Sequence, residues 1–270
     1  MRTSYYAIPS ASLGQNAKIP LVKMDSSEAV FYQLALDMAD TIEAHNENHQ
    51  QTVFICPVGP VGQYPYFVKL VEERRLALKN VWFLNMDEYL DDKDHYIDIE
   101  DPLSFRGFMK RTVYDRIDPD LLMPEEQRIF PDPARPEALD RLLEALGGAD
   151  VCYGGIGITG HLAFNEPEPS LSVEAFSALP SRTLSISPET RAANAIGELK
   201  GALEDMPRRC VTIGMKQILS ARRIRLGVFR DWHRAVVRRA AYGEKTTSFP
   251  VTLLQGHPDA VIYVNDVASR

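Results

Sequence analysis

Two polar clusters in this 270-residue chain hold side chains that could move protons. The first is Asn85-Met86-Asp87-Glu88-Tyr89, in which two adjacent carboxylates follow the apolar run from Val81 to Met86. A carboxylate held in a partly dry cleft can act as a general base, whereas a carboxylate in the same place can also cap the next helix. The sequence leaves both roles open for Asp87 and Glu88.

The second cluster is a glycine-rich segment, residues 154–167, with the sequence GGIGITGHLAFNEP. Four glycines among its first seven residues let the backbone turn tightly and come close to a ligand. A lone histidine is more often structural than catalytic. His161 and Glu166, however, lie on one loop, and a nearby carboxylate orients imidazole and favours its charged form. The pair is therefore suited to proton transfer.

A third segment, Pro57 to Pro65 (PVGPVGQYP), follows the first apolar run of the predicted sheet. Its place suits backbone N–H groups that cradle a phosphate at a helix N-terminus. Its composition suits this less well, because prolines remove donors and the loop has no Ser, Thr or Lys. The segment does not match the Walker loop, and a phosphate site and a plain turn both remain open for it.

Short apolar runs separated by helical stretches must position these clusters. Thr52 to Cys56, a helix-like stretch from Tyr66 to Leu78, and Val81 to Met86 have the strand-helix-strand order of a parallel sheet. Further apolar runs lie at Val151 to Tyr153, Cys210 to Ile213, Ile224 to Phe229 and Ala260 to Val264, with a helical stretch at Trp232 to Tyr242.

The pattern predicts a three-layer α/β/α fold with a doubly wound, mostly parallel, Rossmann-like sheet. Such sheets bind ligands beyond the carboxyl ends of their strands, so the chemistry should lie just after the apolar runs.

The chain is expected to form one domain, residues 25–270, after an N-terminal extension of residues 1–24. The extension is punctuated by Pro and Ser and has no clear period. Asp25 and Glu28 resemble a capping box at the start of a long helix. The Pro-rich stretch from Pro124 to Pro136 is interpreted as a loop inside the same domain.

Composition narrows the classes of function. Hydrophobic residues make up 45% and charged residues 25% of the chain, and the net charge is −7. An acidic chain is unsuited to nonspecific nucleic-acid binding. No window approaches a membrane span and the start has no apolar signal core, so a cytoplasmic location is expected. The three cysteines are far apart and no spacing implies a metal or an organic cofactor.

Taken together, the motifs resemble the glucosamine-6-phosphate deaminase/isomerase family, whose fold also includes 6-phosphogluconolactonases. The similarity extends from about Ser26 to Val264. Its strongest marks are residues 85–89 (NMDEY), Gly160-His161, and residues 163–167 (AFNEP), and the last of these is similar to deaminases and not to lactonases. Thr190-Arg191 with Ala193-Asn194, and His257-Pro258, are weaker marks.

The resemblance implies an enzyme that converts an amino-sugar phosphate to a ketose phosphate and ammonia. Asp87 would be the carbon base, His161 and Glu166 the ring-opening pair, and Arg191 the phosphate ligand. Around them it implies a substrate-binding set of Gly59, Gly62, Glu88, Gly160, Asn165, Arg191, His233 and Arg234. The expected partner is a small sugar phosphate, and both monomers and homo-oligomers are compatible with the family.

Several positions depart from the family pattern. Thr159 stands where an aspartate usually precedes Gly-His, and the phosphate loop is filled with prolines. His233 stands where a lysine is expected, and either of the nearby Arg230 and Arg234 could replace that lysine. Leu184 replaces a lysine of the regulatory phosphate site. These changes keep two alternatives open: a non-catalytic, regulatory protein that binds a phosphosugar, and a 6-phosphogluconolactonase-like sugar lactonase.

Overall fold

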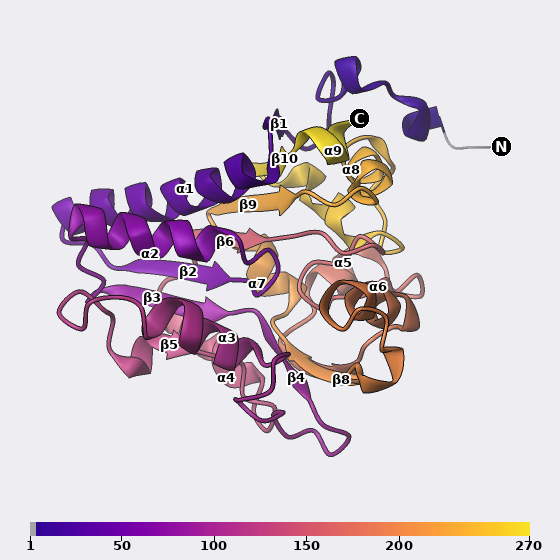
Figure 1. Ribbon diagram of the computed structural model, residues 1–270. Helices are drawn as coiled ribbons and strands as arrows, with labels where there is room; N and C mark the ends of the chain where they lie inside the picture. Colours follow the sequence, from indigo (N-terminus) through magenta and orange to yellow (C-terminus); the bar gives the residue numbers. More distant parts are fainter. Residues whose placement is uncertain (1–3) are drawn as a thin grey trace.

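The computed structural model describes residues 4–270 and shows a three-layer α/β/α arrangement (Figure 1). A seven-stranded sheet has the order β1-β10-β9-β6-β2-β3-β5, and every neighbouring pair is parallel. Its strands are β1 (Leu21–Lys23), β2 (Thr52–Cys56), β3 (Val81–Asn85), β5 (Arg128–Ile129), β6 (Val151–Gly154), β9 (Arg223–Val228) and β10 (Ala260–Val264). The predicted fold class is confirmed.

Helices cover both faces of this sheet. The helices are α1 (Ser27–Glu47), α2 (Gln63–Arg74), α3 (Phe105–Met109), α4 (Glu137–Ala145), α5 (Val173–Ser177), α6 (Pro188–Glu198), α7 (Met215–Leu219), α8 (His233–Tyr242) and α9 (Asp266–Ser269). Short helices of 3-10 or π type lie at Ser4–Ala7, Ser10–Ser12, Lys110–Tyr114, Glu125–Gln127, Leu203–Asp205 and Pro250–Gly256.

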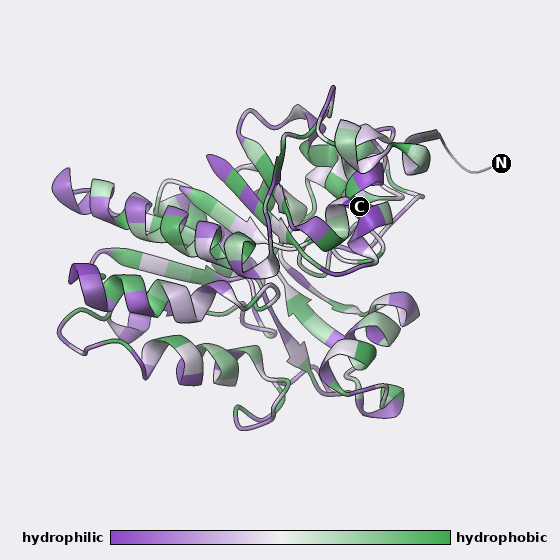
Figure 2. Ribbon diagram, turned by 45° about the horizontal axis from the view of Figure 1, so that its top comes forward, coloured by the Kyte–Doolittle hydropathy of each residue, from purple (hydrophilic) through white to green (hydrophobic). Residues whose placement is uncertain are grey.

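The two cores follow from the alternation of side chains along each strand. In β2, Phe54 and Cys56 face the core under α1 and α2, whereas Val53 and Ile55 face the core under α4, α7 and α8. Because both faces are covered, the whole strand is buried and its sequence is continuously apolar. Figure 2 shows the hydrophobic residues concentrated on the strands and on the inward sides of the helices.

A second, smaller sheet of three antiparallel strands was not predicted. It has the order β4 (Asp87–Leu90), β8 (Arg209–Thr212), β7 (Arg182–Ser185). The run Cys210 to Ile213 therefore does not extend the parallel sheet as expected. It forms the centre of the small sheet, and Cys210 packs with Tyr89 and Phe164 in a separate core that includes Ala195 of α6.

The N-terminal segment lies on the domain and ends in its main sheet. Residues 21–23 form edge strand β1, which pairs with β10, so the end of the predicted extension is structurally part of the sheet. Arg238 Nε of α8 donates to the Ile8 carbonyl at 2.9 Å. Helix α1 begins after Ser26, whose hydroxyl accepts from the Ala29 N–H, and not through the predicted box at Asp25.

The other predicted boundaries differ by a few residues. Helix α2 begins at Gln63 and ends before Arg75, which has a left-handed φ of 51°, so it lies about three residues earlier than expected. The Pro-rich stretch contributes β5 to the main sheet and belongs to the same body.

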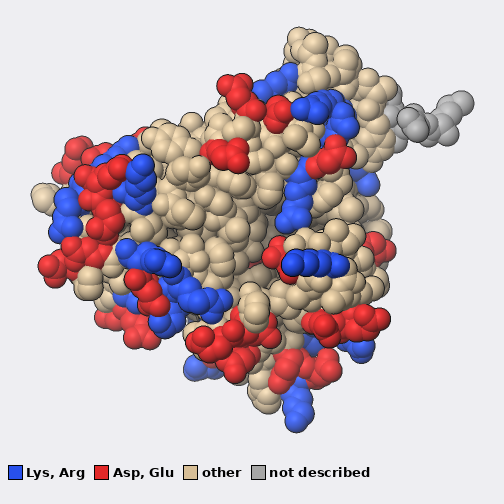
Figure 3. All heavy atoms as spheres, in the orientation of Figure 1, with Lys and Arg blue, Asp and Glu red and all other residues tan. Residues whose placement is uncertain are grey.

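Within residues 4–270, no helix is long and apolar enough to cross a membrane. On the face seen in Figure 3, acidic and basic side chains intermingle around a largely uncharged centre.

Candidate functional site

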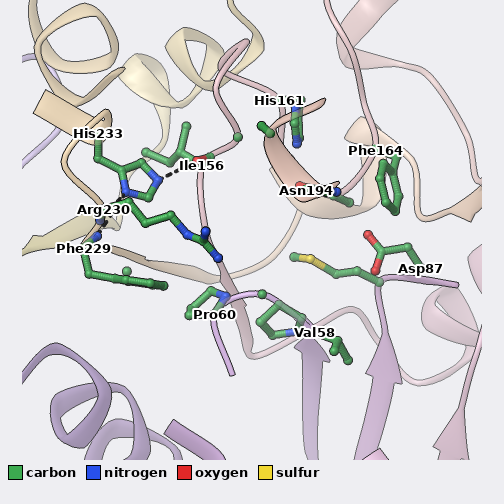
Figure 4. A pocket seen from close by; sticks show the side chains of 18 of the residues that line it. Val58, Pro60, Asp87, Ile156, His161, Phe164, Asn194, Phe229, Arg230 and His233 are labelled. Carbon is green, nitrogen blue, oxygen red and sulfur yellow. Dashed lines mark hydrogen bonds between the residues drawn. The ribbon is translucent and has the colours of Figure 1, made fainter. Parts of the chain in front are cut away.

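A cavity opens at the carboxyl ends of β2, β3, β6 and β9, where the connecting loops converge. It encloses about 820 Å³, part of it open to solvent. Its walls come from the loop after β2, the β3–β4 junction, the glycine-rich loop after β6, helix α6, and the segment between β9 and α8 (Figure 4). This is the position expected for a ligand site in a sheet of parallel strands.

Asp87 lines this cavity from the first position of β4. Its carboxylate points into the cavity beside Phe164 (Figure 4) and is 7% exposed. Burial, and then the neighbouring Glu88 charge, raises the pKa of Asp87 well above its ordinary range. A carboxyl group in this environment can hold a proton under milder conditions than an exposed one, as a group that takes up and returns a proton requires.

Glu88 has a different environment from its neighbour. Its buried carboxylate accepts hydrogen bonds from Ser104 Oγ at 3.0 Å and from the N–H groups of Phe105 and Arg106 at 3.0 and 2.8 Å. These N–H groups open α3, so Glu88 caps the next helix along the chain, and Arg106 Nε also donates to it at 3.2 Å. Glu88 does not line the cavity, and the two roles left open for the carboxylate pair are divided between them.

The ring of His161 faces the cavity, and a hydrogen bond at Nδ1 fixes its orientation. Thr159 Oγ1 lies 2.8 Å from His161 Nδ1 and donates its hydroxyl proton to Glu166 Oε2 at 3.0 Å. A hydroxyl has one proton, so Thr159 must accept from Nδ1–H of the imidazole. In the neutral ring this leaves Nε2 with a free lone pair, which can accept a proton from a ligand in the cavity.

Glu166 completes this group from behind His161. Its Oε2 lies 3.4 Å from Nδ1, and its side chain is 14% exposed. Burial opposes ionisation of the carboxyl, but hydrogen bonds from His161, Thr190 and Thr159 and the charge of His161 outweigh it. The pKa of Glu166 is thereby lowered to about 2. Glu166 contacts the histidine and is not among the residues that line the cavity.

Two glycines shape the loop that carries His161. A Cβ atom on Gly157 would overlap the imidazole, so the ring lies flat against this stretch of backbone. Gly160 has a φ of +79°, which favours glycine, and a Cβ there would overlap the Phe249 ring. Gly160 thus forms the turn behind the site and does not line the cavity.

The glycine-rich loop is tied to the small sheet. Asn165 is buried, and its Nδ2 donates to the carbonyls of Leu162 and Ile213 at 3.0 and 2.9 Å, so its role in the structure is to fix the loop. The Phe164 N–H donates to Thr212 Oγ1 at 3.1 Å, and Thr212 is also the register partner of Asp87. One residue of β8 therefore holds both sides of the site.

His233 lines the cavity without contributing charge. Its Nδ1 accepts from the N–H groups of Phe229 and Arg230 at 3.1 and 2.9 Å, so Nε2 carries the proton and donates to the Ile156 carbonyl at 3.0 Å. Burial chiefly, and the nearby Arg230 charge, lower the pKa of His233 to about 4. The imidazole is therefore neutral at physiological pH. It also occupies two backbone N–H groups that could otherwise bind an anion at the start of the helix.

Of the remaining residues predicted to bind the substrate, one lines the cavity and three do not. Gly59 lines the cavity. Gly62 lies outside it, at the start of α2, where a Cβ would overlap Phe31. Arg191 donates to the backbone carbonyls of Leu203, Met206 and Pro207, and Arg234 pairs with Asp231 at the surface, so neither arginine lines the cavity in this structure.

Arg230 lines the cavity, whereas the sequence indicated it only as one of two arginines that could replace the expected lysine and not as a member of the substrate-binding set. Its side chain projects into the cavity between the β2 loop and α6 (Figure 4). The sequence signal for its place in the cavity is that it is the first charged residue after strand β9.

Within residues 4–270, no group of three His, Cys, Asp or Glu side chains is placed to hold a metal ion.

Comparison with solved structures defines the class of fold. A monomeric glucosamine-6-phosphate deaminase superposes with a TM-score of 0.79 at 24% identity, covering 92% of this chain and 98% of that one. A 6-phosphogluconolactonase from Shewanella baltica gives a TM-score of 0.59 at 17% identity, covering 91% and 97%. The chain has the α/β fold that these deaminases and lactonases share.

Sequence relatives identify the family within this class. Glucosamine-6-phosphate deaminase of Porphyromonas gingivalis is 32% identical over 214 residues, which cover 77% of this chain and 76% of that protein. The Clostridium perfringens enzyme of the same name is 29% identical over 214 residues, covering 78% and 83%. No protein-family model matches the chain. The chain belongs to the glucosamine-6-phosphate deaminase family.

Proposed function

We propose that the protein is a deaminase and aldose-ketose isomerase that converts an amino-sugar phosphate and water to a ketose phosphate and ammonia. The observation that carries the proposal is the cavity shared by Asp87 and His161, which follow different strands of the fold. The reaction needs an acid/base group at the ring oxygen and a second one at neighbouring carbons, and the two side chains are arranged for these separate tasks.

His161 opens the sugar ring in this proposal. Its Nε2 takes the proton of the C1 hydroxyl and delivers a proton to the ring oxygen as the bond between that oxygen and C1 breaks. Thr159 and Glu166 stabilise the protonated ring through Nδ1, since the hydroxyl accepts from it and the carboxylate lies 3.4 Å away. Thr159 thus connects the imidazole of His161 to the carboxylate of Glu166 through two hydrogen bonds.

Asp87 then moves a proton between the carbons. It takes the C2 proton from the open-chain amino aldehyde while water protonates the C1 oxygen, which forms an enolamine. It then returns the proton to C1 as the amino group loses a proton to water. The resulting C2 imine adds water, and ammonia leaves as the C2 carbonyl forms. The buried position of Asp87, with its raised pKa, supports this role because the carboxyl must hold the proton between the two steps.

The test is turnover of glucosamine 6-phosphate and its epimers, with ammonia and ketose phosphate measured separately. Wild-type protein is expected to form both products in equal amounts, and Asp87→Asn to abolish both because the amide cannot accept the C2 proton. Glu88→Gln is a poor control because Glu88 caps α3, so Glu144→Gln at the exposed surface of α4 serves instead. The proposal fails if the wild type shows no turnover beyond the Asp87→Asn level.

A second candidate is a protein that binds the sugar without converting it. The observation that favours it is the neutral His233 at the cavity, beside a proline-filled loop with no Ser or Thr hydroxyl. Binding of a phosphosugar without product formation would support this candidate. Turnover that disappears in His161→Ala would exclude it. A lactonase differs from both, since it needs no carbon base and should tolerate Asp87→Asn.

A further inference from the structure

We propose that Arg230, positioned by Gly197 and Glu198 of α6, binds the anionic end of the substrate and makes the site specific for a phosphorylated sugar. The inference rests on the proposed function and adds a specificity-determining residue to it. Among the described residues that line the cavity, Arg230 is the one Lys or Arg side chain. Of the described side chains that line this cavity, Arg230 is therefore the one whose positive charge does not depend on taking up a proton.

The guanidinium of Arg230 is both directed and available. It points into the cavity from the segment that joins β9 to α8 (Figure 4), and its side chain is 41% exposed. Its ion pair with Glu198 Oε1 is 3.7 Å long, at the outer limit for such a contact. Exposed pairs of this kind contribute little to stability, so the guanidinium can exchange the carboxylate for a ligand oxygen at small cost.

Gly197 provides the surface on which this guanidinium rests. A Cβ atom there would lie 2.7 Å from Arg230 Nη1, closer than real Cβ contacts allow. Glycine is unfavourable inside a helix, and Gly197 is the next to last residue of α6. Its φ is not in the left-handed region, so the close approach of Arg230 is the reason that the structure offers for a glycine at this position.

The other groups near this end of the cavity cannot take the role. His233 is neutral and occupies the N–H groups of Phe229 and Arg230. The loop residues that line the cavity, Pro57 to Pro60, have no side-chain donor. Arg234 lies outside the cavity, where it pairs with Asp231. Arg230 is left as the group able to bind a phosphate bidentately.

The main experiment compares glucosamine 6-phosphate with glucosamine as substrates of the full chain. In Arg230→Met, kcat/KM for the phosphorylated sugar should fall by about ten- to a hundredfold, the loss expected for a charge-assisted contact, while kcat/KM for glucosamine stays within about twofold. Arg234→Met is the matched comparison from the same helix start. An equal loss on both sugars, or a larger loss of preference in Arg234→Met, would overturn the proposal.

Two substitutions in α6 test how Arg230 is positioned. Gly197→Ala should displace the flexible guanidinium and not the helix, so preference for the phosphorylated sugar should fall while thermal stability is kept or rises. Glu198→Gln should lower KM for the phosphorylated sugar by up to about fivefold, because the competing carboxylate is removed. A Gly197→Ala protein with unchanged preference would argue against this arrangement.

A binding measurement separates this proposal from the proposed function. Glucitol 6-phosphate has no aldehyde and cannot be isomerised, and glucitol lacks only the phosphate. Calorimetry should show that wild type and the surface variant Glu144→Gln bind glucitol 6-phosphate alike, and that Arg230→Met binds it at least about tenfold more weakly. This result would support Arg230 even in a protein without turnover. Equal binding by wild type and Arg230→Met, or no binding by the wild type, would refute it.

Discussion

Glu166→Gln should remove a part of the folding free energy that depends strongly on pH. The substitution keeps the shape of the side chain and removes its charge. Burial disfavours the carboxylate, yet its contacts with His161, Thr190 and Thr159 lower its pKa from an ordinary 4.5 to about 2. A group whose pKa is lower in the folded chain than in the unfolded chain stabilises the fold where it is ionised in both states.

The sign and size of the effect follow from this difference. The stabilisation is complete above pH 4.5 and disappears as the pH falls toward 2. Its full value is on the order of 3 kcal/mol, of which about 2 kcal/mol is already lost at pH 3. The side chain is 14% exposed, so solvent screening takes away little of it.

The assay is urea unfolding of both proteins between pH 3 and pH 7. The wild type should lose about 2 kcal/mol more than Glu166→Gln on going from pH 7 to pH 3, since all other carboxyl groups are common to both. Glu144→Gln, which changes an exposed carboxylate on α4, should follow the wild-type curve. If the Glu166→Gln and wild-type curves ran parallel, the carboxylate would not be held by the contacts described for it.

Three further outcomes concern the proposed catalytic groups. Gly157→Ala should reduce kcat by at least about tenfold, because the new methyl group overlaps the imidazole of His161 and displaces it. An unchanged kcat would contradict that packing. Thr159→Asp should raise any turnover limited by ring opening, since it puts a charge next to the imidazole, and a lower or equal rate would count against this explanation of the departure. The acid limb of the kcat/KM profile should lie well above pH 3.8, because burial raises the pKa of Asp87 and protonation removes the base; a limb at that pH or below would exclude Asp87 as the titrating base.

The large sheet could be predicted from the sequence because its central strands are buried on both faces. Such strands are continuously apolar and end at a polar loop, so the bounds of Thr52–Cys56 and Ala260–Val264 were predicted to the residue. The shared position of Asp87 and His161 was also predicted, since carboxyl ends of parallel strands meet at one edge of a sheet.

The small sheet and the charge inside the cavity could not be predicted. Strands of four residues, such as Asp87–Leu90, carry too few alternations to show a period, and their antiparallel pairing depends on segments far apart in the chain. The role of His233 depends on the backbone N–H groups that its ring meets, and the role of Arg230 depends on the Glu198 carboxylate that its guanidinium meets. The order of residues around His233 and Arg230 does not show which groups these side chains contact. The path of the chain after β9 determines the contacts.

Thr212 has a consequence beyond its own contacts. Its backbone aligns the strand that carries Asp87, and its hydroxyl anchors Phe164, three residues beyond His161, although it does not itself line the cavity. The spacing between Asp87 and His161, the proposed proton-transfer groups, is thus set by a residue outside the cavity. A methyl group in place of that hydroxyl would therefore change the position of the proposed catalytic pair while leaving both of its side chains intact.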